Sequence, residues 1–234
     1  VIMNELADDP DIRAVVIAGK GKHFTIGLDL KAFGSLAGGG NGGSEATKRL
    51  TVLRNVKRLQ GSITSIADCR KPVIAAVHGY CLGGGIDLIT ACDVRLAAAD
   101  AIFSVRETKI AIVADVGTLQ RLPGIVGEGH VAELVYTGKD VPAARAKEIG
   151  LVNDVLPDAA AVVAAAQAMA AEIAANSPLA VQGSKAVLRA CRGRSTAEGL
   201  DYVAVWNSAF IQSDDLTEAM AAFVEKRPPR FTGR

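Results

Sequence analysis

The stretch KPVIAAVHGYCLGGGIDLI, residues 71–89, decides the fold of this 234-residue chain. The apolar run at 73–77 is typical of a strand buried on both faces. We expect residues 78–85 to form a tight glycine-rich loop and a helix to begin at Ile86. The N–H groups of a helix's first turn have no partner within the helix, and glycines let a ligand approach them closely. The stretch therefore predicts an α/β fold with a loop suited to hold an anion or a developing oxyanion, although a purely structural turn has the same pattern.

The segments on either side extend this pattern into an α/β core. Short apolar runs predict strands at 12–18, 94–98, 101–105 and 151–155. Apolar residues that recur every three or four positions predict helices at 45–69, 117–126, 128–136 and 142–148. The glycine-rich residues 34–44 are predicted to form a mobile surface loop.

The C-terminal part of the sequence is helical and rich in alanine. Helix starts are expected at Asp158, Ser177 and Ser195, because each is a capping residue ahead of an apolar stripe. The chain is thus predicted to have two parts. Residues 1–156 form an α/β core, and residues 157–234 form a helical region.

The composition argues against several classes of protein. A net charge of +1 gives no field for attracting nucleic acid. The four cysteines lack paired spacing, the three histidines lack metal-ligand spacing, and the glycine loop does not match nucleotide-binding patterns. We expect no metal site, no membrane-spanning helix and no secretory signal, and hence a soluble intracellular protein.

Three carboxylates lie where chemistry is possible. Asp87 falls in the first turn of the helix after the glycine loop, Glu107 follows the strand at 101–105, and Asp115 precedes the helix at 117–126. Each residue, taken alone, also fits a structural role. Asp87 would complement the helix dipole, Glu107 would be a surface charge, and Asp115 would cap a helix.

Several long segments of the chain resemble the crotonase superfamily, the enoyl-CoA hydratases and isomerases. These segments are residues 23–30, 71–89, 114–123 and 225–227, and the resemblance covers essentially the whole chain. It implies a spiral of ββα units followed by a C-terminal helical region that assembles trimers or dimers of trimers. It also implies an acyl-CoA thioester as substrate, with no cofactor or metal. The strands and helix that precede residue 1 in the family would be missing from this chain.

The resemblance assigns a binding site as well as a fold. The backbone amides of Leu28 and Gly84 would form an oxyanion hole for the thioester carbonyl. The residues expected to bind the substrate and its CoA are Thr25, Ile26, Gly27, Leu28, Asp29, Leu30, Gly84 and Gly85. The expected compartment is the cytoplasm of a bacterial type of cell, with the mitochondrial matrix as the alternative if an N-terminal segment is missing.

Within the superfamily, the chain most resembles the isomerases that convert 3,5-dienoyl-CoA to 2,4-dienoyl-CoA. These enzymes have Asp, Glu and Asp separated by 20 and then 8 residues, as at positions 87, 107 and 115 here. The hydratases have Glu at the first two positions and usually Gly at the third. The resemblance makes Glu107 the base at carbon 2 and Asp115 the acid at carbon 6, while Asp87 orients or polarises the site. Residues 108–113 are more basic and bulkier than the family pattern, which suggests a different chain-length preference.

Other functions fit parts of the same pattern. A 2-enoyl-CoA hydratase would use Asp87 and Glu107 and leave Asp115 without a role, and a Δ3-Δ2-enoyl-CoA isomerase is a third possibility. A non-enzymatic acyl-CoA-binding scaffold would need no proton donors. The presence of all three acids together with the glycine loop favours an enzyme of fatty acid β-oxidation.

Overall fold

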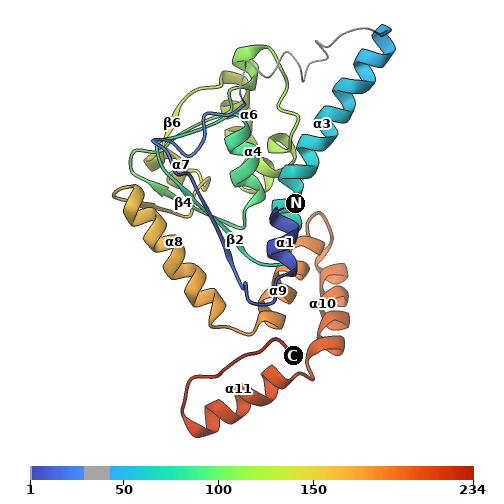
Figure 1. The fold of residues 1–234 in the computed structure, drawn as a ribbon, viewed down its shortest axis with the longest axis vertical. Coiled ribbons are helices and arrows are strands. Elements are labelled where there is room, and N and C mark those ends of the chain that lie inside the picture. Colours follow the sequence, from blue (N-terminus) through green and yellow to red (C-terminus); the bar gives the residue numbers. More distant parts are fainter. Residues whose placement is uncertain (1, 29–42) are drawn as a thin grey trace. The chain divides into compact units, whose positions relative to one another are not determined.

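The structure is a computed structural model that describes residues 2–28 and 43–234 (Figure 1). Of the glycine-rich residues 34–44, only the last two lie among the described residues. The strands are β1 (Val15–Ala18), β2 (Val73–Val77), β3 (Tyr80–Leu82), β4 (Val94–Ala98), β5 (Ile102–Ser104), β6 (Val141–Pro142) and β7 (Asp154–Leu156). The α-helices are α1 (Ile2–Asp8), α3 (Glu45–Asp68), α4 (Gly84–Ala91), α5 (Thr118–Arg121), α6 (Glu128–Thr137), α7 (Ala143–Glu148), α8 (Ala159–Ala174), α9 (Pro178–Ala190), α10 (Thr196–Phe210) and α11 (Asp214–Glu225). Two short 3-10 helices are η1 (Glu107–Ile110) and η2 (Leu122–Gly124).

The chain forms two compact units. The larger unit comprises residues 16–68 and 73–166, and the smaller comprises residues 1–15, 69–72 and 167–234. The division after residue 166 falls inside α8, ten residues beyond the predicted boundary at 156. The candidate active-site residues among those described all belong to the larger unit.

Two sheets form the framework of the larger unit. The first has the strand order β1-β2-β4-β7 and the second the order β3-β5-β6. The chain passes from β2 in the first sheet to β3 in the second, and again from β4 to β5. β2 pairs parallel with β4, and β3 pairs parallel with β5. This alternation between sheets is the ββα spiral that the family resemblance implies, and the completely buried β2 lies in its core.

The prediction of a loop at residues 78–85 is wrong in part. Tyr80, Cys81 and Leu82 form β3, which pairs with β5 from Tyr80 opposite Ile102 to Leu82 opposite Ser104. A strand of only three residues between glycines carries no recognisable apolar period, so its pairing with a distant segment decides its structure. α4 also begins at Gly84, two residues earlier than expected.

Helix caps in the C-terminal part confirm the predicted helix starts. The Asp158 Oδ1 accepts a hydrogen bond from the Ala161 N–H at 2.8 Å, at the beginning of α8. The Ser177 hydroxyl caps α9, and Ser195 forms a capping box with Glu198 at the start of α10. Each cap satisfies N–H groups that the helix itself leaves unpaired.

The smaller unit is held together by buried polar side chains. The Lys71 ammonium donates to the backbone carbonyls of Leu6 and Asp9, and Lys185 donates to the Lys71 carbonyl at 2.9 Å. Asp215 accepts hydrogen bonds from the backbone N–H groups at 232 and 233. Among the described residues, no single helix is long and apolar enough to cross a membrane, and α8 and α9 satisfy length and composition only as a bent pair.

The glycine loop predicts a sharp difference between two neighbouring substitutions. A Cβ at Gly85 would lie 2.6 Å from the Thr25 methyl group and 3.1 Å from the Cys81 sulfur, whereas a Cβ at Gly84 would meet nothing within 4 Å. Gly85→Ala should therefore lower the free energy of unfolding by about 1–3 kcal/mol through overpacking. Gly84→Ala, in the same helical turn, should change it little. Urea unfolding of both variants measures the difference, and equal effects would contradict this packing.

Candidate active site

The glycine loop leaves the N-terminus of α4 accessible. Gly83 is the residue before the helix, with φ at +53° and ψ at −118°, a conformation that favours glycine. Its N–H donates to the Ser104 carbonyl at 2.9 Å, which fixes the loop to the end of β5. Gly84 begins the helix, so its N–H has no carbonyl partner four residues earlier within the helix. Apart from its chain neighbours and the backbone of its own helix, no atom lies within 4 Å of the position that a Gly84 Cβ would occupy, and Gly84 is exposed.

A second backbone segment runs beside the loop. The Thr25 N–H donates to the Tyr80 carbonyl at 2.9 Å, and the Leu82 N–H donates to the Thr25 carbonyl at 3.1 Å. Gly27 has φ at +94°, and a Cβ there would lie 3.1 Å from the Leu82 carbonyl oxygen and 3.8 Å from the Gly84 nitrogen. The residue after Gly27 is the predicted oxyanion-hole residue Leu28, which is 42% exposed. The structure thus places Thr25 and Gly27 beside β3 and the N-terminus of α4, with Ile26 and Leu28 as their chain neighbours, while Asp29 and Leu30 lie outside the described residues.

Parallel pairing of β3 and β5 brings the first two acids together. Parallel strands end at the same edge of a sheet, so the residues that follow β3 and those that follow β5 emerge side by side. Asp87 comes five residues after β3, and Glu107 comes three residues after β5. A Cβ at Gly83 would lie only 3.4 Å from the Glu107 Oε1, which confirms that the glycine loop and Glu107 are neighbours.

Asp87 is buried and anchors another helix. Its Oδ1 accepts hydrogen bonds from the Thr118 N–H at 2.6 Å and the Thr118 hydroxyl at 2.8 Å, at the first residue of α5. Burial raises the pKa of Asp87, and the negative charge of Asp115 raises it further, while the Thr118 hydrogen bonds oppose this rise. Asp87 therefore serves the N-terminus of α5 in addition to lying in the first turn of its own helix.

Glu107 carries the most unusual carboxylate of the site. The residue is 8% exposed, and its Oε2 is buried without a hydrogen-bond partner among the described residues. A buried carboxylate oxygen without a protein partner is costly, and such groups are often found at functional sites. Burial raises the pKa of Glu107, and the negative charges of Asp87 and Asp115 also raise it. Glu107 is therefore not the surface charge that its basic neighbours in the sequence suggest.

Asp115 differs from the other two acids because it is exposed. Its negative charge nevertheless raises the pKa of both Asp87 and Glu107, so it lies within electrostatic reach of each. Its backbone carbonyl accepts a hydrogen bond from the Gln60 side chain at 2.6 Å, which ties the loop before α5 to α3. The cap position of α5 is occupied by Gly117, so the structure does not use Asp115 as the helix cap.

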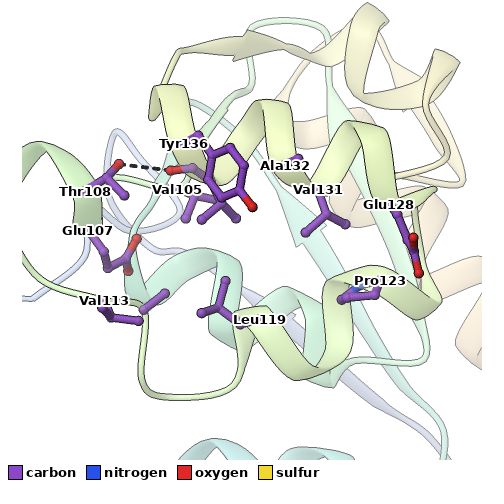
Figure 2. A pocket seen from close by; sticks show the side chains of 12 residues that line it. Val105, Glu107, Thr108, Val113, Leu119, Pro123, Glu128, Val131, Ala132 and Tyr136 are labelled. Atoms are coloured by element: carbon purple, nitrogen blue, oxygen red, sulfur yellow. Dashed lines mark hydrogen bonds between the residues drawn. The ribbon is translucent and has the colours of Figure 1, made fainter.

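An apolar pocket of about 530 Å³ extends away from Glu107. Figure 2 shows it between α5 with η2 on one side and α6 on the other, with Glu107 at one end and Glu128 at the other. The lining residues are Val105, Glu107, Thr108, Val113, Ala114, Leu119, Pro123, Glu128, Val131, Ala132, Val135 and Tyr136. The Thr108 hydroxyl donates to the Val135 carbonyl at 3.0 Å and joins η1 to α6. The pocket suits an apolar chain whose reactive end lies beside Glu107.

Residues that sequence reasoning missed support this arrangement. Thr118 holds Asp87, and the Arg121 guanidinium donates to the Thr64 hydroxyl at 3.0 Å, while its charge partly opposes the rise that burial causes in the pKa of Asp87. The side chain of Arg121 also packs over Gly117, where a Cβ would collide with the guanidinium. These contacts join positions 31 and 57 residues apart, and no local pattern in the sequence signals them.

The fold and the site together define a class of protein. Backbone amides at a helix N-terminus, two buried carboxyl groups with raised pKa values and an apolar pocket are suited to proton transfer on a polarised carbonyl compound with an apolar chain. Among the described residues, no group of three or more His, Cys, Asp or Glu side chains is arranged to hold a metal ion. The architecture is that of the crotonases.

Comparison with known proteins gives the family. The model of the enoyl-CoA hydratase/isomerase family matches residues 2–234, and the chain belongs to this family. It is 46% identical to the peroxisomal Δ(3,5)-Δ(2,4)-dienoyl-CoA isomerase of Arabidopsis thaliana, with 98% of this chain and 83% of the relative covered. It is 45% identical to the mitochondrial enzyme of the same name from Dictyostelium discoideum, with 98% and 78% covered. The crystal structure of an enoyl-CoA hydratase from Bacillus anthracis is 33% identical and superposes with a TM-score of 0.89, covering 100% of this chain and 86% of that one.

The buried state of Glu107 predicts how stability depends on pH. Because its pKa is raised on folding, the folded protein binds this proton more tightly than the unfolded chain does. The contribution of Glu107 to stability is therefore most favourable at low pH and is lost as the pH rises through the folded pKa. Glu107→Gln should unfold at a higher urea concentration than the parent protein at pH 8. The two proteins should converge as the pH falls below the ordinary Glu value of 4.5. A variant that is less stable at pH 8 would contradict the raised pKa.

Proposed function

We propose that the protein is an isomerase that converts a 3,5-dienoyl-CoA to a 2,4-dienoyl-CoA in fatty acid β-oxidation. The observation that carries this proposal is the buried, unpartnered Oε2 of Glu107 beside the charges of Asp87 and Asp115. The relatives at 45–46% identity that bear this enzyme's name support it. The three acids have the spacing by which this chain resembles such isomerases.

The first task of the site is to polarise the thioester. Its carbonyl oxygen would accept hydrogen bonds from the N–H groups of Leu28 and Gly84. These residues belong to two segments that approach each other closely at Gly27. Such preorganised donors stabilise the negative charge that develops on oxygen, and losing one donor typically costs about 3–4 kcal/mol in the barrier. Stabilising this charge acidifies the protons on carbon 2. The CoA portion would follow residues 25–28 towards Asp29 and Leu30.

The second task is to move two protons. Glu107 takes a proton from carbon 2, and the electron pair spreads through the two double bonds to carbon 6. In the protonation state that reacts, Glu107 is ionised and Asp115 carries a proton. Asp115 delivers this proton to carbon 6, so the double bonds move from positions 3 and 5 to positions 2 and 4. Glu107 then releases its proton and Asp115 regains one, which restores the starting state. Carboxylates carry every proton, so the proposed chemistry requires no cofactor other than the CoA of the substrate.

Asp87 supports the other two acids in this mechanism. Its carboxylate holds the first residue of α5, which follows the loop that carries Asp115. Its negative charge raises the pKa of Glu107 and so strengthens Glu107 as a base. Asp87 lies three residues after Gly84 in the same helical turn. The helix therefore holds the Asp87 carboxylate in a fixed position relative to the proposed oxyanion hole.

Substitution of Asp115 separates the isomerase from a hydratase. Asp115→Asn should leave folding and acyl-CoA binding nearly unchanged, because the residue is exposed and its backbone carbonyl contact remains. Turnover of 3,5-dienoyl-CoA should fall by about 10²–10⁴-fold, the usual contribution of a positioned acid. Asp201→Asn, on the exposed surface of α10, is the matched control and should be fully active.

The outcome that contradicts the proposal is equally specific. Full dienoyl-CoA isomerase turnover in Asp115→Asn would remove Asp115 from the mechanism. Vigorous hydration of crotonyl-CoA by the parent protein would favour the 2-enoyl-CoA hydratase; the Bacillus anthracis structure is named an enoyl-CoA hydratase. Tight acyl-CoA binding without any turnover would favour a binding scaffold.

The proposed assembly is a homotrimer or a dimer of trimers. α11 exposes Leu216, Met220, Phe223 and Val224, which follow one another at helical spacing along one side and are 40–83% exposed. Such a continuous apolar face is unfavourable in water and is typical of a subunit interface. The proposed compartment is the cytoplasm, and the mitochondrial matrix is the alternative, because the relative from Dictyostelium discoideum is named mitochondrial.

Light scattering tests this assembly. The parent protein should have the molar mass of three or six chains. Phe223→Lys should lower the molar mass towards that of a single chain, because assembly would bury a charge in the interface. Lys226→Phe is not a suitable control, since Lys226 has a positive φ of 54°. Glu225→Lys, an exposed residue of the same helix outside this apolar face, should keep the parent mass. A parent protein that is a single chain at micromolar concentration would contradict the proposal.

A further inference from the structure

The charged residues that line the apolar pocket bear on which acyl-chain ends the pocket can accept. Among the described residues that line the pocket, the two charged side chains are Glu107 and Glu128, and both are acidic. Figure 2 places them at opposite ends, with the apolar side chains of α5, η2 and α6 between them. Glu107 belongs to the proposed proton transfer, whereas Glu128 has no part in it.

Glu128 occupies a defined place in the fold. It is the first residue of α6, after the cap residue Gly127, and its side chain lies beside Pro123 of η2 in Figure 2. The pocket follows α6 from Glu128 to Tyr136, which corresponds to about 12 Å of helix. An acyl chain that has carbons 2 to 6 beside the catalytic acids would thus extend its far end towards Glu128.

We propose that Glu128 makes the enzyme selective for acyl chains with an uncharged end and disfavours chains that end in a second carboxylate. This inference rests on the proposed function, because it takes the pocket as the site of the acyl chain. An ω-carboxylate would approach a like charge at the rim of an apolar pocket that offers it no cation among the described lining residues. An alkyl end buries its surface against Leu119, Pro123 and Val131 without such repulsion.

The experiment compares two substrates of equal length. One is a 3,5-dienoyl-CoA with a terminal methyl group, and the other has a carboxylate in place of that methyl. The parent protein should have the higher kcat/KM for the uncharged substrate. Glu128→Gln should raise kcat/KM for the ω-carboxyl substrate, relative to kcat/KM for the uncharged substrate, by roughly fivefold at low salt, since charges near solvent interact by about 1 kcal/mol. Glu128→Lys should raise it further, and added salt should reduce the difference.

The matched control removes a charge from the same helix outside the pocket. Glu133 lies five residues further along α6 and pairs with Lys139 and Arg145. Glu133→Gln should leave the ratio of the two kcat/KM values unchanged. An unchanged ratio in Glu128→Gln, or an equal change in Glu133→Gln, would overturn the inference.

A binding measurement distinguishes this inference from the proposed function. Calorimetry with a saturated acyl-CoA and its ω-carboxyl counterpart needs no catalysis. If the parent protein isomerises neither dienoyl substrate, the proposed function fails. The selectivity is then supported if Glu128→Gln improves binding of the ω-carboxyl compound alone, and it is overturned if binding of the two compounds changes equally.

Discussion

The burial of two neighbouring acidic side chains, Asp87 and Glu107, is the constraint on which the site depends. Burial raises both pKa values, and each further negative charge nearby raises them more. The protein compensates one acid through the two hydrogen bonds from Thr118 and leaves the Oε2 of Glu107 without a partner. An uncompensated carboxylate lowers stability, so its presence at the end of an apolar pocket is understandable as a requirement of catalysis.

The ββα spiral explains how this arrangement is built from distant parts of the chain. Because β3 and β5 are parallel, α4 and η1 both begin at the same edge of the second sheet. The N-terminus of α4 provides the Gly84 N–H and, within the same turn, the Asp87 carboxylate. η1 provides Glu107, and its contact with α6 through Thr108 forms the wall of the pocket. In the proposed mechanism, polarisation, proton transfer and recognition of the acyl chain thus depend on a few short elements in fixed register.

Much of this could be predicted from residues 71–89, because local patterns determine a buried strand, a helix start and a glycine loop. The caps at Ser177 and Ser195 were predictable for the same reason. β3 was not, since its three residues become a strand only by pairing with β5. The bond from Thr118 to Asp87, the orphaned oxygen of Glu107 and the exposure of Asp115 arise from tertiary packing. The sequence named the three acids through a family resemblance, but their different environments required the structure.

The central claim is that Asp115, although exposed, acts on the buried Glu107 as part of one electrostatic cluster. The most direct measurement is an NMR titration of the ¹³C-labelled Glu107 carboxyl group in the parent protein and in Asp115→Asn. The account predicts a pKa above the ordinary Glu value of 4.5 in the parent protein and a lower pKa in the variant, because a like charge has been removed. A Glu107 that titrates at its ordinary value in both proteins would contradict the account.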